Sequence, residues 1–276
     1  MSLAHDLQYA AELARGAGKI ILEHYGKVQR LTKTHVAASA EAVTDADRAS
    51  QRFIVAALRK RFPDDGVVGE ESDSGQSITF ECNDTRGRNW VIDPIDGTNN
   101  FIAGLGMFCV CIALIDQGEP ILGVVYDVTR DLMYTAARGQ GAWLGSKRLF
   151  VLATPLSESA MIMFTSNLLT RGRCPDWAHR FVAQDQWKLR ILGSAALEAT
   201  YVAAGVAHAA VTVNGKLWDV AAAAALILEA GGVMTDLTGR AIFPFDLAHY
   251  QGAKVPFLAA APAAQQPLLD LIAAHP

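Results

Sequence analysis

Two carboxylates stand three residues apart in the stretch WVIDPIDGTNNF, residues 90–101. Asp93 ends an apolar run that is typical of a β-strand, and Asp96 follows it after a proline and an isoleucine. Because proline cannot donate to a strand ladder, we expect the strand to stop at Pro94 and Asp96 to turn toward the side of Asp93. The N–H groups after Asp96 would open a short helix, whose N-terminus attracts anions. Carboxylates beside an anion site predict Mg²⁺ that bridges protein and phosphate.

Further acidic residues stand at the ends of other expected elements. Glu70 and Glu71 follow the apolar run VVG, Asp219 stands at the start of an expected helix, and the segment VTDAD adds Asp45 and Asp47. Each alone has an ordinary structural role, because Asp is a common turn former and a common helix N-cap. Together with the pair Asp93 and Asp96, these segments place acidic residues at the ends of four elements. If all four meet in one pocket, they are more than turns and helix caps require. We therefore expect an acidic, metal-binding pocket.

These residues resemble the signatures of the inositol monophosphatase family. The resemblance rests on residues 69–71 (GEE), 93–98 (DPIDGT) and 218–222 (WDVAA), with VTDAD and EAGG in the expected order and at the expected spacing. It spans nearly the whole chain, from the first expected helix to the last expected strand. It implies an α+β fold that forms a layered αβαβα sandwich. It also implies a homodimer that hydrolyses phosphate monoesters with Mg²⁺ and is often inhibited by Li⁺.

The resemblance implies a ligand set for two or three Mg²⁺ ions. Glu70, Asp93 and the carbonyl of Ile95 would hold the first ion. Asp93, Asp96 and Asp219 would hold the second. Two metal ions about 4 Å apart activate water, neutralise the phosphoryl oxygens and assist the leaving oxygen. Neither a histidine nor a nucleophilic cysteine is then required, and we expect the seven scattered histidines to have surface or packing roles.

The resemblance assigns catalytic roles to three residues. Thr98 would hydrogen-bond the nucleophilic water, and Asp47 would orient the Thr98 hydroxyl. Glu71 would bind the first metal ion through water. The N–H groups of Gly97 and Thr98 would cradle phosphate oxygens. Lys33 lies in a polar loop where related proteins often carry a basic residue, but its spacing favours a solvated surface lysine.

Residues of the second half are expected to select the substrate. The resemblance implies that Gly193, Ser194 and Ala195 contact the polar part of the substrate. In members that hydrolyse inositol phosphates, a glutamate seven residues before the last metal-binding aspartate binds inositol hydroxyls, and that position is Thr212 here. One hydroxyl cannot replace the acceptors of a carboxylate, so inositol specificity stays open.

Several substrates and one regulatory role agree with this pattern. A monoester that resembles inositol 1-phosphate leads, and histidinol phosphate, a 3′-phosphoadenosine nucleotide, NADP and fructose bisphosphate are alternatives. Asn214 and Lys216 are nearby candidates for an altered pocket, or turn formers. A regulatory partner of RNA polymerase with secondary activity is the alternative of another class. The intact acidic residues favour an enzyme, because buried carboxylates repel one another without a metal ion.

Composition limits the class of protein. The chain has 276 residues, of which 51% are hydrophobic and 19% charged, and its net charge is −4. These values predict one catalytic unit or two closely packed halves. The pattern of expected elements divides the chain into residues 1–153, with the metal-binding motifs, and residues 154–276, with the specificity residues and the last metal ligand. The acidic balance disfavours direct nucleic-acid binding. With no apolar run of about 20 residues, and with cysteines that form no ligand pattern, we expect a cytoplasmic protein without a membrane partner.

The hydrophobic pattern predicts an α+β first half with a meandering sheet and an α/β second half. A helix begins the chain, and a second helix opens at Asp47. Strands are expected at 67–72, 90–93, 108–116, 121–128, 132–137, 160–164, 189–192, 208–213 and 233–236, a hairpin at 139–149, and helices at 177–182, 194–205 and 219–232.

Overall fold

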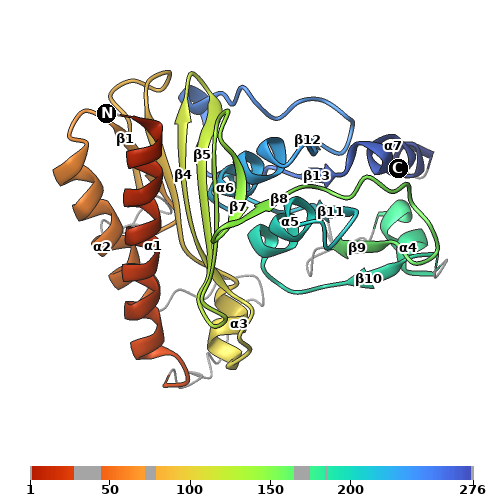
Figure 1. Ribbon diagram of the computed structural model, residues 1–276, viewed down its shortest axis with the longest axis horizontal. Helices are drawn as coiled ribbons and strands as arrows, with labels where there is room; N and C mark the ends of the chain where they lie inside the picture. Colours follow the sequence, from red (N-terminus) through yellow and green to blue (C-terminus); the bar gives the residue numbers. More distant parts are fainter. Residues whose placement is uncertain (1, 28–44, 72–78, 165–174, 184–185, 275–276) are drawn as a thin grey trace.

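The computed structural model describes residues 2–27, 45–71, 79–164, 175–183 and 186–274 (Figure 1). The helices in chain order are α1 (Leu3–His24), α2 (Asp45–Arg61), α3 (Thr98–Ala103), α4 (Asp176–Ala183), α5 (Ala195–Ala203), α6 (Leu217–Glu229), the 3₁₀ helix η1 (Leu247–His249) and α7 (Pro262–Ala274). The strands are β1 (Gly66–Gly69), β2 (Thr79–Glu81), β3 (Asn89–Asp96), β4 (Cys109–Asp116), β5 (Glu119–Asp127), β6 (Leu132–Ala137), β7 (Gly141–Leu144), β8 (Lys147–Leu149), β9 (Met161–Phe164), β10 (Lys188–Arg190), β11 (Ala209–Thr212), β12 (Val233–Thr235) and β13 (Phe257–Ala260).

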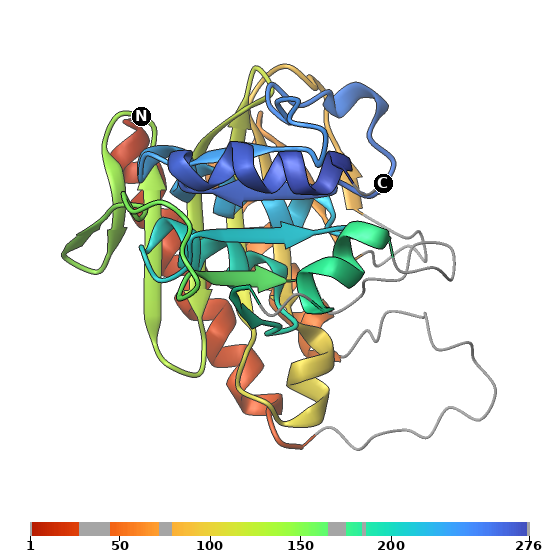
Figure 2. The same cartoon turned by 90° about the vertical axis from the view of Figure 1, so that its right-hand side faces the viewer.

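Helices and sheets stack in five alternating layers (Figure 1). α1 and α2 cover the outer face of an eight-stranded sheet, and α5 and α6 lie between this sheet and a five-stranded one. α4 and α7 cover the outer face of the five-stranded sheet (Figure 2). The expected αβαβα sandwich is confirmed.

The eight-stranded sheet has the strand order β2-β1-β3-β4-β5-β6-β7-β8. β1 pairs with β3 in parallel, and the other neighbouring strands pair antiparallel as a meander. β4 and β5 are buried along nearly their whole length, because helices cover both faces of the sheet. Strands buried on both faces form continuous apolar runs, which is why their sequences predicted them clearly.

The strand that carries the first two aspartates is longer than the sequence predicted. β3 continues through Pro94 to Asp96 and pairs with β4 at both Asp93 and Asp96. The pairing register shifts between these two aspartates, so the ladder is irregular where proline lacks a donor. The prediction that the strand stops at Pro94 is therefore wrong, and both aspartates belong to the end of one strand.

The five-stranded sheet has the order β10-β9-β11-β13-β12. β10, β9 and β11 are parallel, whereas β13 pairs antiparallel with β11 and with β12. The border between halves expected after residue 153 lies between β8 and β9. The sequence did not predict β2, β13, η1 or α7. Short apolar runs such as FLAA show no period that distinguishes strand from helix.

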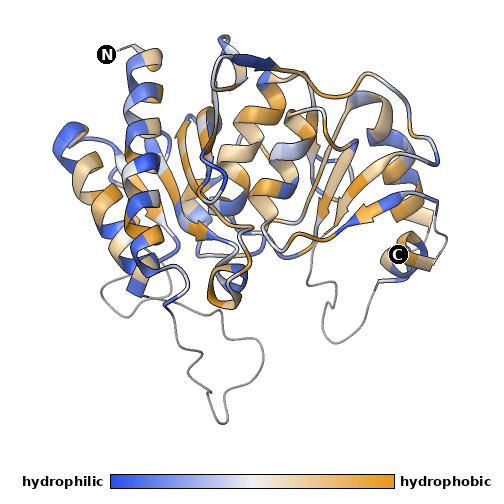
Figure 3. Ribbon diagram, turned by 60° about the horizontal axis from the view of Figure 1, so that its bottom comes forward, coloured by the Kyte–Doolittle hydropathy of each residue, from blue (hydrophilic) through white to orange (hydrophobic). Residues whose placement is uncertain are grey.

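The outer helix α1 is amphipathic, whereas the central helix α6 is apolar nearly all round. α1 buries Ala10, Ala14, Ala17 and Ile21, and hydrophilic residues cover its other side (Figure 3). A helix that lies between two sheets has no solvent face, which explains the alanine-rich sequence of α6. Within the described ranges, none of the helices combines the length with the apolar character that a membrane span needs.

Close packing of α6 on β5 depends on one glycine. A Cβ added at Gly123 would lie 2.3 Å from the Ala222 carbonyl oxygen and 2.9 Å from the Ala225 Cβ. Both contacts are too short for any side chain, so Gly123 allows the helix to approach the strand. Because α6 carries Asp219, this contact also sets the position of a predicted metal ligand.

Replacement of Gly123 by alanine should weaken both the fold and the site. The added methyl group would push α6 and Asp219 away from β5. Overpacking of this kind lowers the free energy of unfolding by about 1–3 kcal/mol. Urea unfolding should show that loss, and a metal titration should show weaker binding.

Gly145→Ala is the matched control for that variant. No described atom lies within 4 Å of its added Cβ, and only its left-handed φ of 55° opposes alanine. It should cost about 1–2 kcal/mol of stability and leave metal affinity as it was. Unchanged metal affinity in Gly123→Ala would contradict this account of the α6 contact.

Candidate active site

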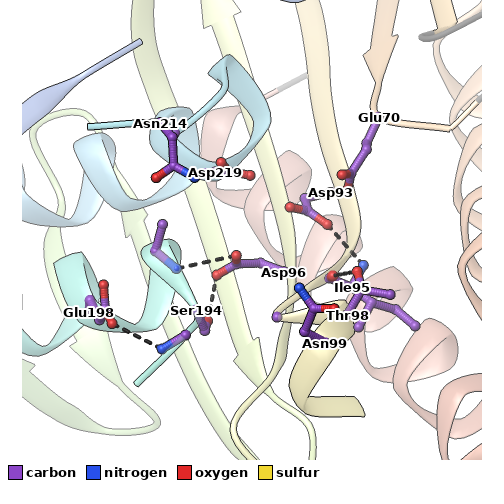
Figure 4. A pocket seen from close by; sticks show the side chains of 14 residues that line it. Glu70, Asp93, Ile95, Asp96, Thr98, Asn99, Ser194, Glu198, Asn214 and Asp219 are labelled. Atoms are coloured by element: carbon purple, nitrogen blue, oxygen red, sulfur yellow. Dashed lines mark hydrogen bonds between the residues drawn. The ribbon is translucent and has the colours of Figure 1, made fainter. Parts of the chain in front are cut away.

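A polar pocket opens at the end of β3 and faces the first turns of α5 and α6 (Figure 4). It brings together predicted residues that lie more than 100 positions apart in the sequence. Its lining residues are Glu70, Asp93, Ile95, Asp96, Gly97, Thr98, Asn99, Gly193, Ser194, Ala195, Glu198, Asn214, Gly215 and Asp219.

Three aspartates form the centre of this pocket. Asp93, Asp96 and Asp219 each offer one carboxylate oxygen, and these atoms lie within 4.8 Å of one another. Glu70 lines the same pocket, and Figure 4 shows its side chain directed toward Asp93. Four carboxyl groups, two from the end of β3, one after β1 and one from the first turn of α6, therefore share one small space.

Asp219 occupies a different helical position from the expected N-cap. α6 begins at Leu217, and its N-cap residue is Lys216. Asp219 is the third helical residue, and its Oδ2 accepts a 2.8 Å hydrogen bond from the Lys216 N–H. The N-cap interpretation is wrong because the helix begins two residues earlier. A carboxylate at the third position still satisfies a free N–H of the first turn.

Burial and mutual repulsion raise the pKa values of these acidic groups. Burial is the largest cause for both Glu70 and Asp93, whose pKa values lie well above their ordinary range. Asp219 and Asp47 add to the effect on Glu70. Glu70, Asp219 and Asp96 add to the effect on Asp93. A divalent cation would relieve this repulsion, so the donor set fits a metal ion.

Asp96 receives three hydrogen bonds from the opposite wall of the pocket. The Ser194 hydroxyl and the Ala196 N–H donate to its Oδ2, the latter at 2.8 Å. The Ala195 N–H donates to its Oδ1 at 3.3 Å. Burial raises the pKa of Asp96, and these donors lower it. An aspartate of the first half is thus held by the first turn of α5 in the second half (Figure 4).

A left-handed turn leads from β3 into α3. Gly97 has a φ of 95°, and a Cβ there would lie 2.8 Å from the Met107 carbonyl oxygen, so only glycine fits. Thr98 donates its hydroxyl proton to the Ile95 carbonyl at 3.0 Å. The Asp47 carboxylate lies 3.5 Å from the same hydroxyl, at the outer limit of a hydrogen bond. The hydroxyl has one proton, which these two acceptor oxygens share, and its oxygen keeps lone pairs for a further hydrogen bond.

Asp47 and three further residues considered at the sequence level are not among the described lining residues. The Glu71 N–H donates to Gln51 Oε1 at 3.0 Å, which fixes its main chain beside α2. Thr212 is 1% exposed within β11, and its hydroxyl has no hydrogen-bond partner among the described residues. Lys216 directs its Nζ to the Gly252 carbonyl. The metal-binding role of Glu71 stays a prediction.

The substrate side of the pocket differs from the expectation in one respect. Asn214 and Gly215 line it, two and three residues beyond Thr212. The structure therefore places Asn214, and not Thr212, among the described lining residues. Lys33 lies outside the described residues.

Glu198 lines the pocket although the sequence did not single it out, and Asn99 lines it beside Thr98. Glu198 is 1% exposed, and its Oε1 accepts hydrogen bonds from the N–H groups of Leu192 at 2.7 Å and Gly193 at 3.1 Å. Burial raises the pKa of Glu198 to about 8, while these two N–H groups lower it. The sequence carried one signal for Glu198: it follows Ser194 by one helical turn, so the two residues lie on the same face of the helix.

Similarity to known proteins decides the family. The sequence profile of the inositol monophosphatase family matches residues 2–273. The chain belongs to the inositol monophosphatase family. Members of this inositol monophosphatase family are metal-dependent phosphatases of small phosphate monoesters, and so is this protein.

Individual relatives agree with this membership in the inositol monophosphatase family. A fructose-1,6-bisphosphatase/inositol-1-monophosphatase of Thermotoga maritima is 36% identical over 237 residues, which cover 85% of this chain and 86% of that protein. A Nus factor SuhB of Xylella fastidiosa is 36% identical over 234 residues, or 82% and 80% of the two chains. The structure of an IMPase from Thermotoga maritima superposes with a TM-score of 0.81 at 31% identity, covering 98% and 97%.

The raised carboxyl pKa values predict how pH and metal binding are linked. Glu70, Asp93 and Asp96 bind protons more tightly in the folded chain than in the unfolded chain. The free energy of unfolding of the metal-free protein should therefore fall as pH rises above about 4, the ordinary carboxyl range. A cation must displace those protons, so it should stabilise the protein more at high pH.

Thermal unfolding with and without saturating MgCl₂ measures this linkage. The rise in melting temperature should be larger at about pH 8 than at about pH 5.5. Asp93→Asn removes a carboxylate that interacts with Glu70, Asp96 and Asp219, and should reduce the rise at both pH values. An equal rise at both pH values in the unaltered protein would show that these carboxyl groups do not bind the cation.

Proposed function

We propose that this phosphatase uses Mg²⁺ to hydrolyse a monoester that resembles inositol 1-phosphate. One observation carries the proposal: the oxygens of Asp93, Asp96 and Asp219 lie within 4.8 Å of one another, in the pocket that Thr98 and Gly97 also line. Mg²⁺ bound there supplies water activation and charge neutralisation for ester hydrolysis.

Five residues are proposed to hold two or three Mg²⁺ ions. Glu70, Asp93 and the Ile95 carbonyl hold the first ion, and Asp93, Asp96 and Asp219 hold the second. Both Glu70 and Asp219 raise the pKa of Asp93, which supports a position of Asp93 between the two proposed ion sites. The hydrogen bond from the Ile95 N–H to Asp93 Oδ1, at 2.9 Å, leaves the other carboxylate oxygen for a cation.

The chain's own groups are proposed to position water and phosphate. Thr98 accepts a hydrogen bond from the attacking water, because its one proton is directed to the Ile95 carbonyl or to the Asp47 carboxylate. Asp47 lies 3.5 Å from that hydroxyl and orients it. The N–H groups of Gly97 and Thr98 precede or begin the first turn of α3, where N–H groups lack helical acceptors, and they bind phosphate oxygens. Glu71 acts through a water molecule.

The wall opposite the carboxylates is proposed to bind the alcohol part of the substrate. Gly193, Ser194 and Ala195 form one side of this wall, and Asn214 forms another. An amide both donates and accepts hydrogen bonds, as the hydroxyls of a polyol require. Inositol 1-phosphate therefore leads, and fructose bisphosphate, histidinol phosphate, a 3′-phosphoadenosine nucleotide and NADP are the alternatives.

A second candidate function is regulatory. The relatives that bear the name Nus factor SuhB support a role as a partner of RNA polymerase with secondary phosphatase activity. For the phosphatase itself, we also propose that Li⁺ inhibits it, that it forms a homodimer in the cytoplasm and that it does not bind nucleic acid directly.

Replacement of Asp93 by asparagine tests the catalytic proposal. Phosphate release should fall by at least about 100-fold, because the shared anionic ligand is lost. The panel comprises inositol 1-phosphate, histidinol phosphate, a 3′-phosphoadenosine nucleotide, NADP and fructose 1,6-bisphosphate, each with and without Mg²⁺. Asp270→Asn, an exposed site on α7, is the control and should keep full activity.

Two outcomes of this panel are decisive. Mg²⁺-dependent release that disappears only in Asp93→Asn supports the proposed site. No release from any of these esters, by a protein that binds Mg²⁺, would contradict the proposed substrate class and favour the regulatory role.

Substrate selection is tested by two variants of neighbouring positions. Asn214→Ala removes an amide from the pocket wall and should raise KM for the best substrate by about 10-fold or more, the scale of a lost polar contact. Thr212→Val removes a buried hydroxyl that does not meet the described pocket and should leave the order of substrates as it was. The opposite pattern would return the selecting role to Thr212.

A further inference from the structure

The position of Asp96 depends on a segment of the second half. Three of its four hydrogen-bond donors come from residues 194–196, where α5 begins, and the fourth is the Cys109 thiol on β4 at 3.7 Å. Two of those donors are main-chain N–H groups, so their position is set by the path of the backbone. Whatever fixes the backbone just before α5 therefore fixes the surroundings of Asp96.

The peptide groups around Leu192 are anchored on both sides. The Leu192 carbonyl accepts a 2.7 Å hydrogen bond from Asn100 Nδ2. The Leu192 and Gly193 N–H groups donate to Glu198 Oε1, at 2.7 and 3.1 Å. Gly193 adopts a φ of 77°, and a Cβ there would lie 3.1 Å from Asn100 Nδ2. The left-handed turn at Gly193 thus brings the backbone directly against the amide of Asn100.

Asn100 makes a second hydrogen bond that reaches the phosphate side of the pocket. Its Nδ2 also donates to the Met107 carbonyl at 2.7 Å, so the two amide protons bond two carbonyl oxygens, those of Met107 and Leu192. The same Met107 carbonyl oxygen lies 2.8 Å from the Cβ position of Gly97. One amide therefore ties the turn at Gly97 in the first half to the turn at Gly193 in the second half.

We propose that Asn100 and Glu198 are positioning residues for metal binding. Together they hold the backbone at Leu192 and Gly193, and that backbone delivers the donors that orient Asp96. The inference rests on the proposed role of Asp96 as a metal ligand. Groups that orient a metal ligand typically contribute about 10–100-fold to metal affinity or activity.

A purely structural role of Asn100 makes a different prediction. A partly buried amide that donates to two carbonyls stabilises any fold, whether or not a site lies nearby. Asn89 provides that comparison within the same chain. It is fully buried at the other end of β3, and its Nδ2 donates to the carbonyls of Asp84 at 3.0 Å and Gly87 at 2.8 Å. Asn89 and Asn100 therefore make the same kind of contact in different places.

The test measures metal binding without substrate. Calorimetric titration with Mn²⁺ alone gives Kd for each folded variant, and urea unfolding gives its stability. Asn100→Ala should raise Kd for Mn²⁺ by about 10-fold or more, whereas Asn89→Ala should lower stability and leave Kd within about threefold. The Mg²⁺ concentration for half-maximal phosphate release should move in parallel with Kd.

Glu198 provides a second pair of variants if Asn100→Ala does not fold. Burial raises the pKa of Glu198 to about 8, so near neutral pH the side chain is mostly uncharged and glutamine resembles it closely. Glu198→Gln keeps the acceptor oxygen and should keep Kd for Mn²⁺ near its original value. Glu198→Ala removes the acceptor and should raise Kd as Asn100→Ala does.

The outcomes separate this inference from the proposed function. Unchanged Kd in folded Asn100→Ala and Glu198→Ala would overturn the positioning role, and so would an equal rise in Asn89→Ala. Asp96→Asn is the remaining comparison. If Asp96→Asn binds Mn²⁺ as the unaltered protein does, the proposed ligand set itself is wrong.

Discussion

Electrostatic repulsion among buried carboxyl groups is the constraint on which this structure depends. Glu70 follows β1, Asp93 and Asp96 end β3, and Asp219 lies in the first turn of α6. Burial raises the pKa values of Glu70, Asp93 and Asp96, and neighbouring carboxylates raise those of Glu70 and Asp93 further. Bringing such groups together lowers the stability of the fold unless a cation shares them. A metal-dependent phosphatase can accept this cost, because a bound cation offsets the repulsion among the carboxylates.

The rest of the fold keeps these groups from moving apart. Both faces of the eight-stranded sheet are covered by helices, so the end of β3 has little freedom. Gly123 lets α6 pack directly on β5, which fixes the distance of Asp219 from β3. The first turn of α5 supplies the donors to Asp96. The site is complete only when the two halves have packed together.

The sequence predicted the long and strongly patterned elements well. The helical spacing at the N-terminus gave α1, and the continuous apolar runs gave β4 and β5, because layers on both faces demand such runs. It did not predict β13 and α7, whose short or weakly periodic sequences fit several structures. It also ended β3 too early at Pro94, since local rules cannot foresee a register shift against β4.

The amino-acid sequence by itself determined which chemical groups the site contains. Glu70, the DPIDGT run and Asp219 are local signals, because carboxylates and a glycine turn are the groups that a cation and phosphate site needs. Only the tertiary structure decided that Asn214 rather than Thr212 lines the pocket, and that Glu198 and Asn100 hold the turn at Gly193. The direction of a side chain depends on how strands and helices pack. The Asn100–Leu192 hydrogen bond joins residues 92 positions apart, and such contacts exist only after the two halves have closed on each other.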